Sequence, residues 1–247
     1  RHPRKNLAQP MPSLTLQLSC YNGSRYLPEL FASLRAQTRQ GWHLLILDNA
    51  SGPEEAALIR AYAEQSGVPH TLFRVETNIG FAGAHAFLFE KLLAERPAEY
   101  VALLNDDAIL EPGYLEELVR ELERHPETAA AQGIIYRWDF EHRDQPDHGK
   151  THILDSAGLK RDWLGRISDR GANAVVPPET LPTTSFQVWG VSGCLPMYRV
   201  AALRSATEHG LIFDKRFRLY KEDVDLAWAL RHEGWTARTV PPARAYH

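Results

Sequence analysis

Short apolar runs alternate with helix-like patterns through the first half of this 247-residue sequence, and this alternation restricts the fold more than any other feature. Apolar residues at a spacing of three to four, such as Phe87, Leu88 and Leu92, indicate helices between the runs. The pattern predicts strands at residues 14–19, 43–47, 71–75 and 100–104, and helices at residues 26–36, 53–65 and 81–95. Repeated βα units form a parallel sheet with helices on both faces, so we expect an α/β fold.

Polar residues follow each of the four predicted strands. Parallel strands end at one edge of a sheet, and ligands of open α/β sheets bind at that edge. Two of these residues, Asn22 and Asn49, are explained equally well as turn or cap residues. The full set is Cys20, Tyr21, Asn22, Asp48, Asn49, Asn78, Asn105, Asp106 and Asp107.

The second half is less regular. Residues 136–171 are polar and rich in histidine without the spacing of a zinc site, which favours a solvated insertion that ends in a hairpin or flap at residues 153–171. Residues 186–197 read as an apolar strand, and a helix is expected from Val200. A helix at residues 222–232 precedes Gly234, and a last strand at residues 236–240 is expected to end at Pro241 and Pro242.

Composition excludes several classes of protein. A hydrophobic fraction of 44% is ordinary for a globular chain, and the net charge of −3 argues against a dedicated nucleic-acid binder. The length suits a single domain over residues 1–247. Only Cys20 and Cys194 occur, both in apolar surroundings, so we expect two reduced, buried thiols. No run is long enough for a membrane span, and the first residues lack the apolar stretch of a signal peptide.

Acidic residues at two places suggest chemistry on a metal-bound diphosphate. A hard divalent cation held by carboxylate oxygens neutralises a diphosphate leaving group, and Asp107, at the end of a buried strand, suits that role. Asp223 lies in the first turn of a helix, where a rigidly held carboxylate can act as a general base on a hydroxyl group. Turn chemistry for Asp107, and favourable interactions with the helix dipole for Glu222 and Asp225, are the competing structural explanations.

Six short motifs occur in a recognisable order. They are Leu18-Ser19-Cys20-Tyr21-Asn22, Leu47-Asp48-Asn49-Ala50-Ser51, Asn78-Ile79-Gly80-Phe81-Ala82-Gly83, Leu104-Asn105-Asp106-Asp107, Ser192-Gly193-Cys194 and Leu219-Tyr220-Lys221-Glu222-Asp223-Val224-Asp225-Leu226. In this order they resemble the family 2 inverting glycosyltransferases, and most of all the members similar to rhamnosyltransferases and galactofuranosyltransferases. The resemblance runs from about Leu14 to His247.

The resemblance implies a GT-A fold, with a Rossmann-like, mostly parallel central sheet flanked by helices. Residues of about 13–110 would then form a nucleotide-binding half, and residues of about 111–247 an acceptor-side half. The implied ligands are a nucleotide-sugar donor, Mg²⁺ or Mn²⁺, and a saccharide or lipid-linked acceptor of cell-surface polysaccharide synthesis. Thymidine-diphosphate rhamnose is the first donor to consider, followed by uridine-diphosphate hexoses.

The resemblance also assigns roles to individual residues. Asp223 matches the catalytic base, and Asp107 the metal-binding aspartate of a D-x-D motif that begins with Asn105 here. His247, 24 residues after Asp223, matches a histidine that completes the metal site. Nucleotide contacts are implied for Cys20, Tyr21, Asn22, Asp48, Asn78, Asn105 and Asp106, and contacts on the sugar or acceptor side for Trp189, Gly193 and Glu222.

Two other functions remain open at this stage. A sugar-nucleotide nucleotidyltransferase would need a phosphate loop rich in glycine and lysine, which residues 19–26 lack. A catalytically silent nucleotide- or carbohydrate-binding protein is suggested by Asn105 in place of an aspartate. The expected location is the cytoplasm. If a segment absent from this sequence binds the membrane, the protein is expected at the inner face of the cell membrane.

Overall fold

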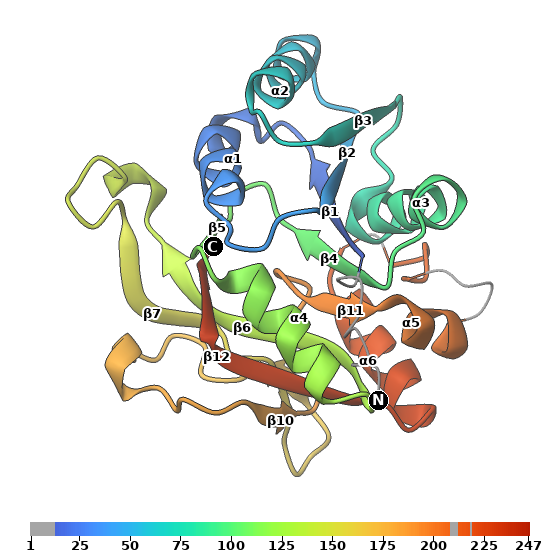
Figure 1. Cartoon of the computed structure of the whole chain (residues 1–247), viewed down its shortest axis with the longest axis vertical. Helices are drawn as coiled ribbons and strands as arrows, with labels where there is room; N and C mark the ends of the chain where they lie inside the picture. Colours follow the sequence, from blue (N-terminus) through green and yellow to red (C-terminus); the bar gives the residue numbers. More distant parts are fainter. Residues whose placement is uncertain (1–12, 208–211, 218) are drawn as a thin grey trace, which may run out of the picture.

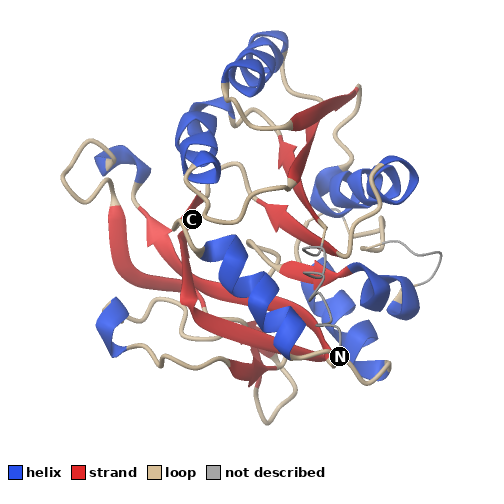
Figure 2. Cartoon of the chain, in the orientation of Figure 1, coloured by secondary structure: helices blue, strands red, loops and turns tan. Residues whose placement is uncertain are grey.

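The computed structural model describes residues 13–207, 212–217 and 219–247. Ten strands form one mixed, mostly parallel sheet, and two more form a separate hairpin (Figures 1 and 2). The main sheet comprises β1 Leu14–Cys20, β2 His43–Asn49, β3 His70–Val75, β4 Tyr100–Leu104, β5 Ile109–Leu110, β6 Thr128–Trp138, β7 Lys150–Ser156, β10 Phe186–Val188, β11 Met197–Arg199 and β12 Thr236–Tyr246. The hairpin comprises β8 Leu159–Arg161 and β9 Ile167–Asp169.

Helices cover both faces of the sheet, as the βα alternation predicts. Side chains of successive strand residues point to opposite faces, so Leu44 and Ile46 join one core and Leu45 and Leu47 join the other. The first core packs against α1, α2 and α4, and the second packs against α3, α5 and α6. These helices are α1 Leu27–Arg35, α2 Pro53–Gln65, α3 Gly80–Glu95, α4 Tyr114–Arg124, α5 Val200–Ala206 and α6 Glu222–His232.

The four predicted strands of the first half are confirmed and lie side by side. The order β4, β1, β2, β3 is parallel throughout, so the carboxyl ends of these strands share one edge. On the other side of β4, the antiparallel β11 separates this unit from β6 and β12. Residues 111–135, for which the sequence predicts no element, form α4 and most of β6.

Two predictions for the second half are wrong. The apolar run at residues 186–197 is not one strand, because β10 pairs with β12 whereas β11 lies between β4 and β6. The last strand does not end at Pro241 and Pro242, since β12 continues to Tyr246 beside β6. A register shift between Val240 and Arg244 removes the two prolines, which lack amide hydrogens, from the hydrogen-bond ladder.

The histidine-rich segment is also more than a solvated insertion. Its first part pairs with the central sheet as β7, which lies antiparallel to β6. Its second part is the β8–β9 hairpin, as the prediction of a hairpin or flap expects. Among the described residues, no helix is both long and apolar enough to cross a lipid bilayer.

Candidate active site at the strand ends

A hollow of about 350 Å³ lies where β1, β2 and β4 end and α3 begins. The residues that line it are Ser19, Tyr21, Asn49, Asn78, Gly80, Phe81, Asp106 and Leu219. The predicted meeting of polar strand ends at one edge of the sheet is therefore present in the structure. Tyr21 is 53% exposed here, which leaves its ring accessible to a bound ligand.

Asn49 and Asn78 organise the loop that leads into α3. The buried Asn49 accepts a hydrogen bond from the amide of Ile79 at 3.0 Å and donates one to the carbonyl of Gly80 at 3.3 Å. The Asn78 side chain accepts a bond from the amide of Gly80 at 2.8 Å. Gly80 has φ of +74°, which a glycine adopts without strain. Asn49 thus positions this part of the hollow.

Asn22 and Asp48 bind protein groups and do not line the hollow. The amide of Asn22 donates to the hydroxyl of Ser51 at 3.0 Å, and the side-chain oxygen of Asn22 accepts from the amide of Gly52 at 2.9 Å. Asp48 accepts from the amide of Ser51 at 2.9 Å and forms an ion pair with Arg74. These bonds tie the loops after β1 and β2 together, beside the hollow.

Cys20 lies beneath the surface of the site, whereas Asp106 is half-buried in the lining of the hollow. The Cys20 side chain belongs to the hydrophobic core, where burial raises the pKa of its thiol well above the ordinary value. Burial, followed by the charge of Asp107, raises the pKa of Asp106 to about 7. A Cβ atom at Gly23 would lie only 2.0 Å from the Asp106 carboxylate, so a larger residue here would displace that carboxylate.

A second group of side chains gathers around the carboxyl-terminal histidine. The Nε2 atom of His247 lies 3.3 Å from Asp107 Oδ1 and 2.8 Å from Asn105 Nδ2. Its Nδ1 atom lies 3.1 Å from Asp155 Oδ2, on β7. Ligand atoms of Asp155, Cys194 and His247 all lie within 4.8 Å of one another. The two residues that the sequence predicts to bind the metal, Asp107 and His247, are therefore neighbours although they are far apart in the sequence.

The donor set of this group fits a divalent cation. Carboxylate and amide oxygens suit Mn²⁺ and Mg²⁺, and an imidazole is a common ligand of divalent metals. The buried Oδ1 atom of Asn105 has no partner among the described residues. The pKa of His247 is raised well above its ordinary value by the Cys194 sulfur and by hydrogen bonds to Asp107 and Asp155, against the lowering effect of burial. A cation would therefore replace a proton at this ring.

The continuation of β12 past its prolines places His247 in this group. The amide of His247 donates to the carbonyl of Tyr136 at 2.8 Å, and its carbonyl accepts from the amide of Trp138 at 2.8 Å. Backbone hydrogen bonds to β6 thus hold His247 in place. From its position in the sequence alone, this residue would be expected to be disordered.

Asp223 is held by backbone amides at the start of α6. Its Oδ2 atom accepts from the amide of Gly193 at 3.1 Å, and its Oδ1 atom accepts from the amide of Val224 at 2.7 Å. The two residues before α6, Tyr220 and Lys221, have φ of +69° and +72°. Left-handed conformations are strained in such residues and concentrate at functional sites.

Glu222 and Gly193 connect this carboxylate with the hollow. Glu222 is buried, its Oε2 atom has no partner among the described residues, and burial raises its pKa. A Cβ atom built on Gly193 would lie 3.7 Å from Glu222 Oε1 and 3.7 Å from the ring of Phe81, which lines the hollow. Asp223 therefore lies beside the space at the strand ends.

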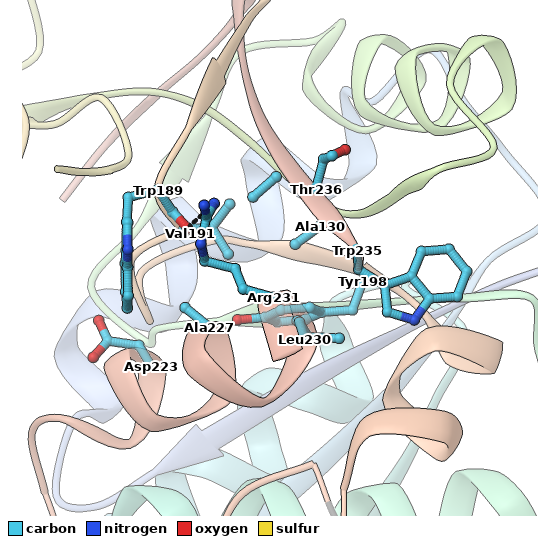
Figure 3. A pocket seen from close by; sticks show the side chains of 12 residues that line it. Ala130, Trp189, Val191, Tyr198, Asp223, Ala227, Leu230, Arg231, Trp235 and Thr236 are labelled. Atoms are coloured by element: carbon cyan, nitrogen blue, oxygen red, sulfur yellow. Dashed lines mark hydrogen bonds between the residues drawn. The ribbon is translucent and has the colours of Figure 1, made fainter. Parts of the chain in front are cut away.

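Trp189 also lies near Asp223. Both residues border a narrow cavity of about 10 Å³, together with Tyr198 and Arg231. Figure 3 shows the Asp223 carboxylate and the Trp189 indole at one end of this cavity, and the hydroxyl of Tyr198 points toward that end. The Trp189 ring contacts Trp228 edge to face, with ring centroids 5.2 Å apart.

The sequence does not reveal three residues of this region. Asp155 contacts His247 from an insertion that is predicted to be solvated. Cys194, which lies close to both, is predicted only to be a buried thiol. Gly23 makes room for Asp106. Local patterns carry no signal for them, because each acts through a contact with a distant part of the chain.

The model of glycosyl transferase family 2 matches residues 16–204, and the chain belongs to this family.

Two relatives illustrate how far the similarity extends. Protein CgeD of Bacillus subtilis is 28% identical over 150 residues, which cover 60% of this chain and 34% of CgeD. The chain thus spans about a third of the length of that relative. The N-acetylglucosaminyl-diphospho-decaprenol L-rhamnosyltransferase of Mycobacterium tuberculosis is 28% identical over 237 residues, which cover 92% of this chain and 73% of the relative.

Solved structures share the fold at lower identity. GalNAc-T7 with UDP, GalNAc and Mn²⁺ superposes with a TM-score of 0.71 at 14% identity, covering 97% of this chain and 44% of that protein. The mannosyltransferase PcManGT from Pyrobaculum calidifontis, in complex with GDP-Man and Mn²⁺, has a TM-score of 0.62 at 16% identity and covers 97% and 57%.

Proposed function

We propose that this chain is an inverting, metal-dependent glycosyltransferase in which Asp223 is the catalytic base. The hydrogen bonds from the amides of Gly193 and Val224, which fix the Asp223 carboxylate beside the strand-end hollow, support this function best. A catalytic base must be held within reach of the proton that it accepts, and backbone amides on a rigid helix start provide such support.

The nucleotide of the donor binds in the hollow at the strand ends. Tyr21 offers an exposed ring for a base, and Asn78 and Asp106 line the space where ribose and phosphate groups would lie. Asn22 and Asp48 act indirectly, since their side chains hold the two loops that border the hollow. The buried Cys20 contributes only backbone groups.

Asp107 and His247 would hold Mg²⁺ or Mn²⁺, with Asn105 and Asp155 beside them. A cation bound there supplies charge neutralisation for the departing diphosphate. The Oδ1 atom of Asn105, which has no partner among the described residues, and the ion pairs of His247 support this assignment. The metal-bound complexes of GalNAc-T7 and PcManGT are consistent with it.

Transfer then proceeds by a single displacement. Asp223 accepts the proton of an acceptor hydroxyl, whose oxygen forms a bond to the anomeric carbon from the face opposite the diphosphate. The bond between that carbon and the diphosphate oxygen breaks, and the diphosphate leaves with the electron pair. The anomeric configuration is inverted. Trp189, Gly193 and Glu222 border the space on the sugar and acceptor side of Asp223.

A relative that covers 92% of this chain supports a proposal for the acceptor class. The name of the Mycobacterium tuberculosis relative specifies a rhamnosyl donor group and a lipid-linked diphosphosaccharide acceptor. We therefore propose a thymidine-diphosphate rhamnose or uridine-diphosphate hexose donor, and an acceptor hydroxyl on a saccharide or lipid-linked saccharide of cell-surface polysaccharide synthesis.

Isothermal titration calorimetry of the chain with thymidine, uridine and guanosine diphosphates, with Mn²⁺ and with chelator, tests the donor site. Metal-dependent binding of one nucleotide, lost in Asp107→Ala, is expected.

In transfer assays with the matching donor, Asp223→Asn should lower the rate at least a thousandfold with donor affinity within threefold of wild type. Asp225→Asn, the same charge change in the same exposed helix turn, is the control and should keep its activity. Loss of donor affinity in Asp223→Asn would contradict the role of a base.

A further inference from the structure

The tip of the β8–β9 hairpin exposes two large apolar side chains. Trp163 is 89% exposed, more than any other large hydrophobic residue in the described parts of the chain, and the adjacent Leu164 is 56% exposed. Hairpin turns are ordinarily polar, because their side chains face water. The hairpin tip, residues 162–166, therefore differs from an ordinary solvent-exposed turn.

The backbone of the hairpin tip is held in one conformation. The carboxylate of Asp162 accepts from the amides of Leu164 and Arg166, each at 2.9 Å, and the amide of Gly165 donates to the carbonyl of Asp162 at 3.0 Å. Gly165 has φ of +82°, which closes the turn. Trp163 and Leu164 are thus presented outward by a preorganised turn, and a binding partner need not order the backbone.

Basic residues surround the hairpin tip. Lys160, Arg161, Arg166 and Arg170 are all exposed, whereas Asp162 and Asp169 are the only acidic residues between positions 159 and 171. Asp162 pairs with Arg166. The hairpin is therefore locally positive on a chain whose formal net charge is −3. Apolar side chains flanked by lysine and arginine form the combination that binds anionic membrane surfaces.

The base of the hairpin is attached to the candidate active site. The amide of Leu159 donates to the carbonyl of Gly190 at 2.8 Å, and the amide of Trp189 donates to the carbonyl of Leu159 at 3.0 Å. Trp189 borders the same cavity as Asp223. Since a strand rises about 3.3 Å per residue, Trp163 lies roughly 13 Å along the chain from Leu159. A surface that binds the hairpin tip would therefore lie close to the acceptor side of the site.

We propose that the hairpin tip binds the interfacial region of an anionic lipid bilayer, with Trp163 and Leu164 inserted and the basic residues on the lipid headgroups. Two apolar side chains are far too few for a stable protein interface, which buries about 800 Å² on each partner. They suit the weak two-signal attachment of peripheral membrane proteins. This inference deepens the proposed function, because it brings Asp223 near the surface in which a lipid-linked acceptor is embedded.

Co-sedimentation of the chain with vesicles tests the proposal. We expect binding to vesicles of equal parts phosphatidylglycerol and phosphatidylcholine, and at least tenfold weaker binding to pure phosphatidylcholine, since each basic residue near an anionic surface contributes about a fivefold effect. Trp163→Ser combined with Leu164→Ser should weaken the binding at least tenfold. Brominated acyl chains should quench tryptophan fluorescence in the wild type and lose this quenching in the double variant.

A matched control is Leu58→Ser, which replaces another exposed leucine, on α2. It should bind vesicles as the wild type does, and both variants should keep the wild-type Tm because the substituted side chains are exposed. Absence of vesicle binding, equal binding to neutral vesicles, or unchanged binding by the double variant would each overturn the proposal. A double variant that loses transfer to a short soluble acceptor would also overturn it, in favour of a saccharide subsite.

The outcome is independent of the catalytic assignment. Vesicle binding requires no donor, metal or transfer, so it would persist if the chain proved catalytically silent. Conversely, transfer to a soluble acceptor without any vesicle binding would support the enzyme and refute the membrane contact.

Discussion

The amide of Gly193 donates a hydrogen bond to the carboxylate of Asp223 at 3.1 Å, and this bond joins two elements that carry opposite sides of the site. Gly193 lies in the loop between β10 and β11, next to Phe81 of the strand-end hollow. Asp223 lies in the first turn of α6. The position of the Asp223 carboxylate relative to the strand-end hollow thus depends in part on the backbone at Gly193.

Side-chain size at position 193 should control transfer. A Cβ atom here would make ordinary contacts, at 3.7 Å from Phe81 and Glu222 and 3.9 Å from Asp223, so Gly193→Ala should change kcat less than about fivefold. Gly193→Leu would fill the space between the hollow and the base, and should lower kcat/KM about a hundredfold or more. Steady-state kinetics of both variants provide the measurement. Equal rates for alanine and leucine would show that position 193 does not border the reacting groups.

Asn105 should limit the affinity for a cation. Its amide lies 2.8 Å from Nε2 of His247, where other D-x-D motifs would supply a carboxylate. Asn105→Asp adds a negative oxygen ligand beside Asp107, and should strengthen Mn²⁺ binding about tenfold in calorimetry of the chain without nucleotide. Gln65→Glu, an amide-to-carboxylate change at the exposed end of α2, is the control and should leave the affinity unchanged. Weaker Mn²⁺ binding by Asn105→Asp would count against a cation at this position.

The sequence predicts the elements whose signals are local. The bounds of α2 and α6 agree with the expected helices, since Pro53 opens the first and Gly234, at φ of +83°, follows the second. The four parallel strands agree to within two residues, because each is an apolar run between helical patterns. The polar residues at their ends follow directly from this arrangement.

The parts of the fold and of the site that the sequence does not predict depend on pairing between distant segments. β6 is buried along most of its length and contains three consecutive alanines, so it shows no alternation that would mark a strand. β12 passes two prolines only because the β6 partner accommodates a register shift there. The contacts of Asp155 and Cys194 with His247 arise from the same pairing, which no local pattern encodes.

Gly133 should be indispensable to that pairing. A Cβ atom at this position of β6 would lie 2.3 Å from the carbonyl oxygen of Ala243 and 2.5 Å from the ring of Tyr114. Neither the backbone of β12 nor the buried tyrosine can move without loss of packing, so Gly133→Ala should destabilise the fold by about 3 kcal/mol and lower Tm by roughly 10 °C. Gly113→Ala meets no atom within 4 Å and is the matched control. Similar Tm values for the two variants in thermal unfolding would refute the close approach of β12.

The buried His85 should make the fold sensitive to acid. Burial lowers the pKa of this histidine on α3 from 6.5 to about 3, and its Nε2 atom has no partner among the described residues. Between these values the unfolded chain binds a proton that the folded chain does not, so the free energy of unfolding falls as pH falls below 6.5, by about 1.4 kcal/mol per pH unit.

Urea unfolding of the wild type and His85→Gln between pH 7.5 and pH 4.5 measures this contribution, because glutamine does not titrate. The variant should lose roughly 3 kcal/mol less than the wild type between pH 6.5 and pH 4.5, whatever its stability at neutral pH. Parallel pH profiles for the two proteins would mean that His85 is protonated in the folded state and that the aromatic surroundings of Phe81 and Phe213 tolerate its charge.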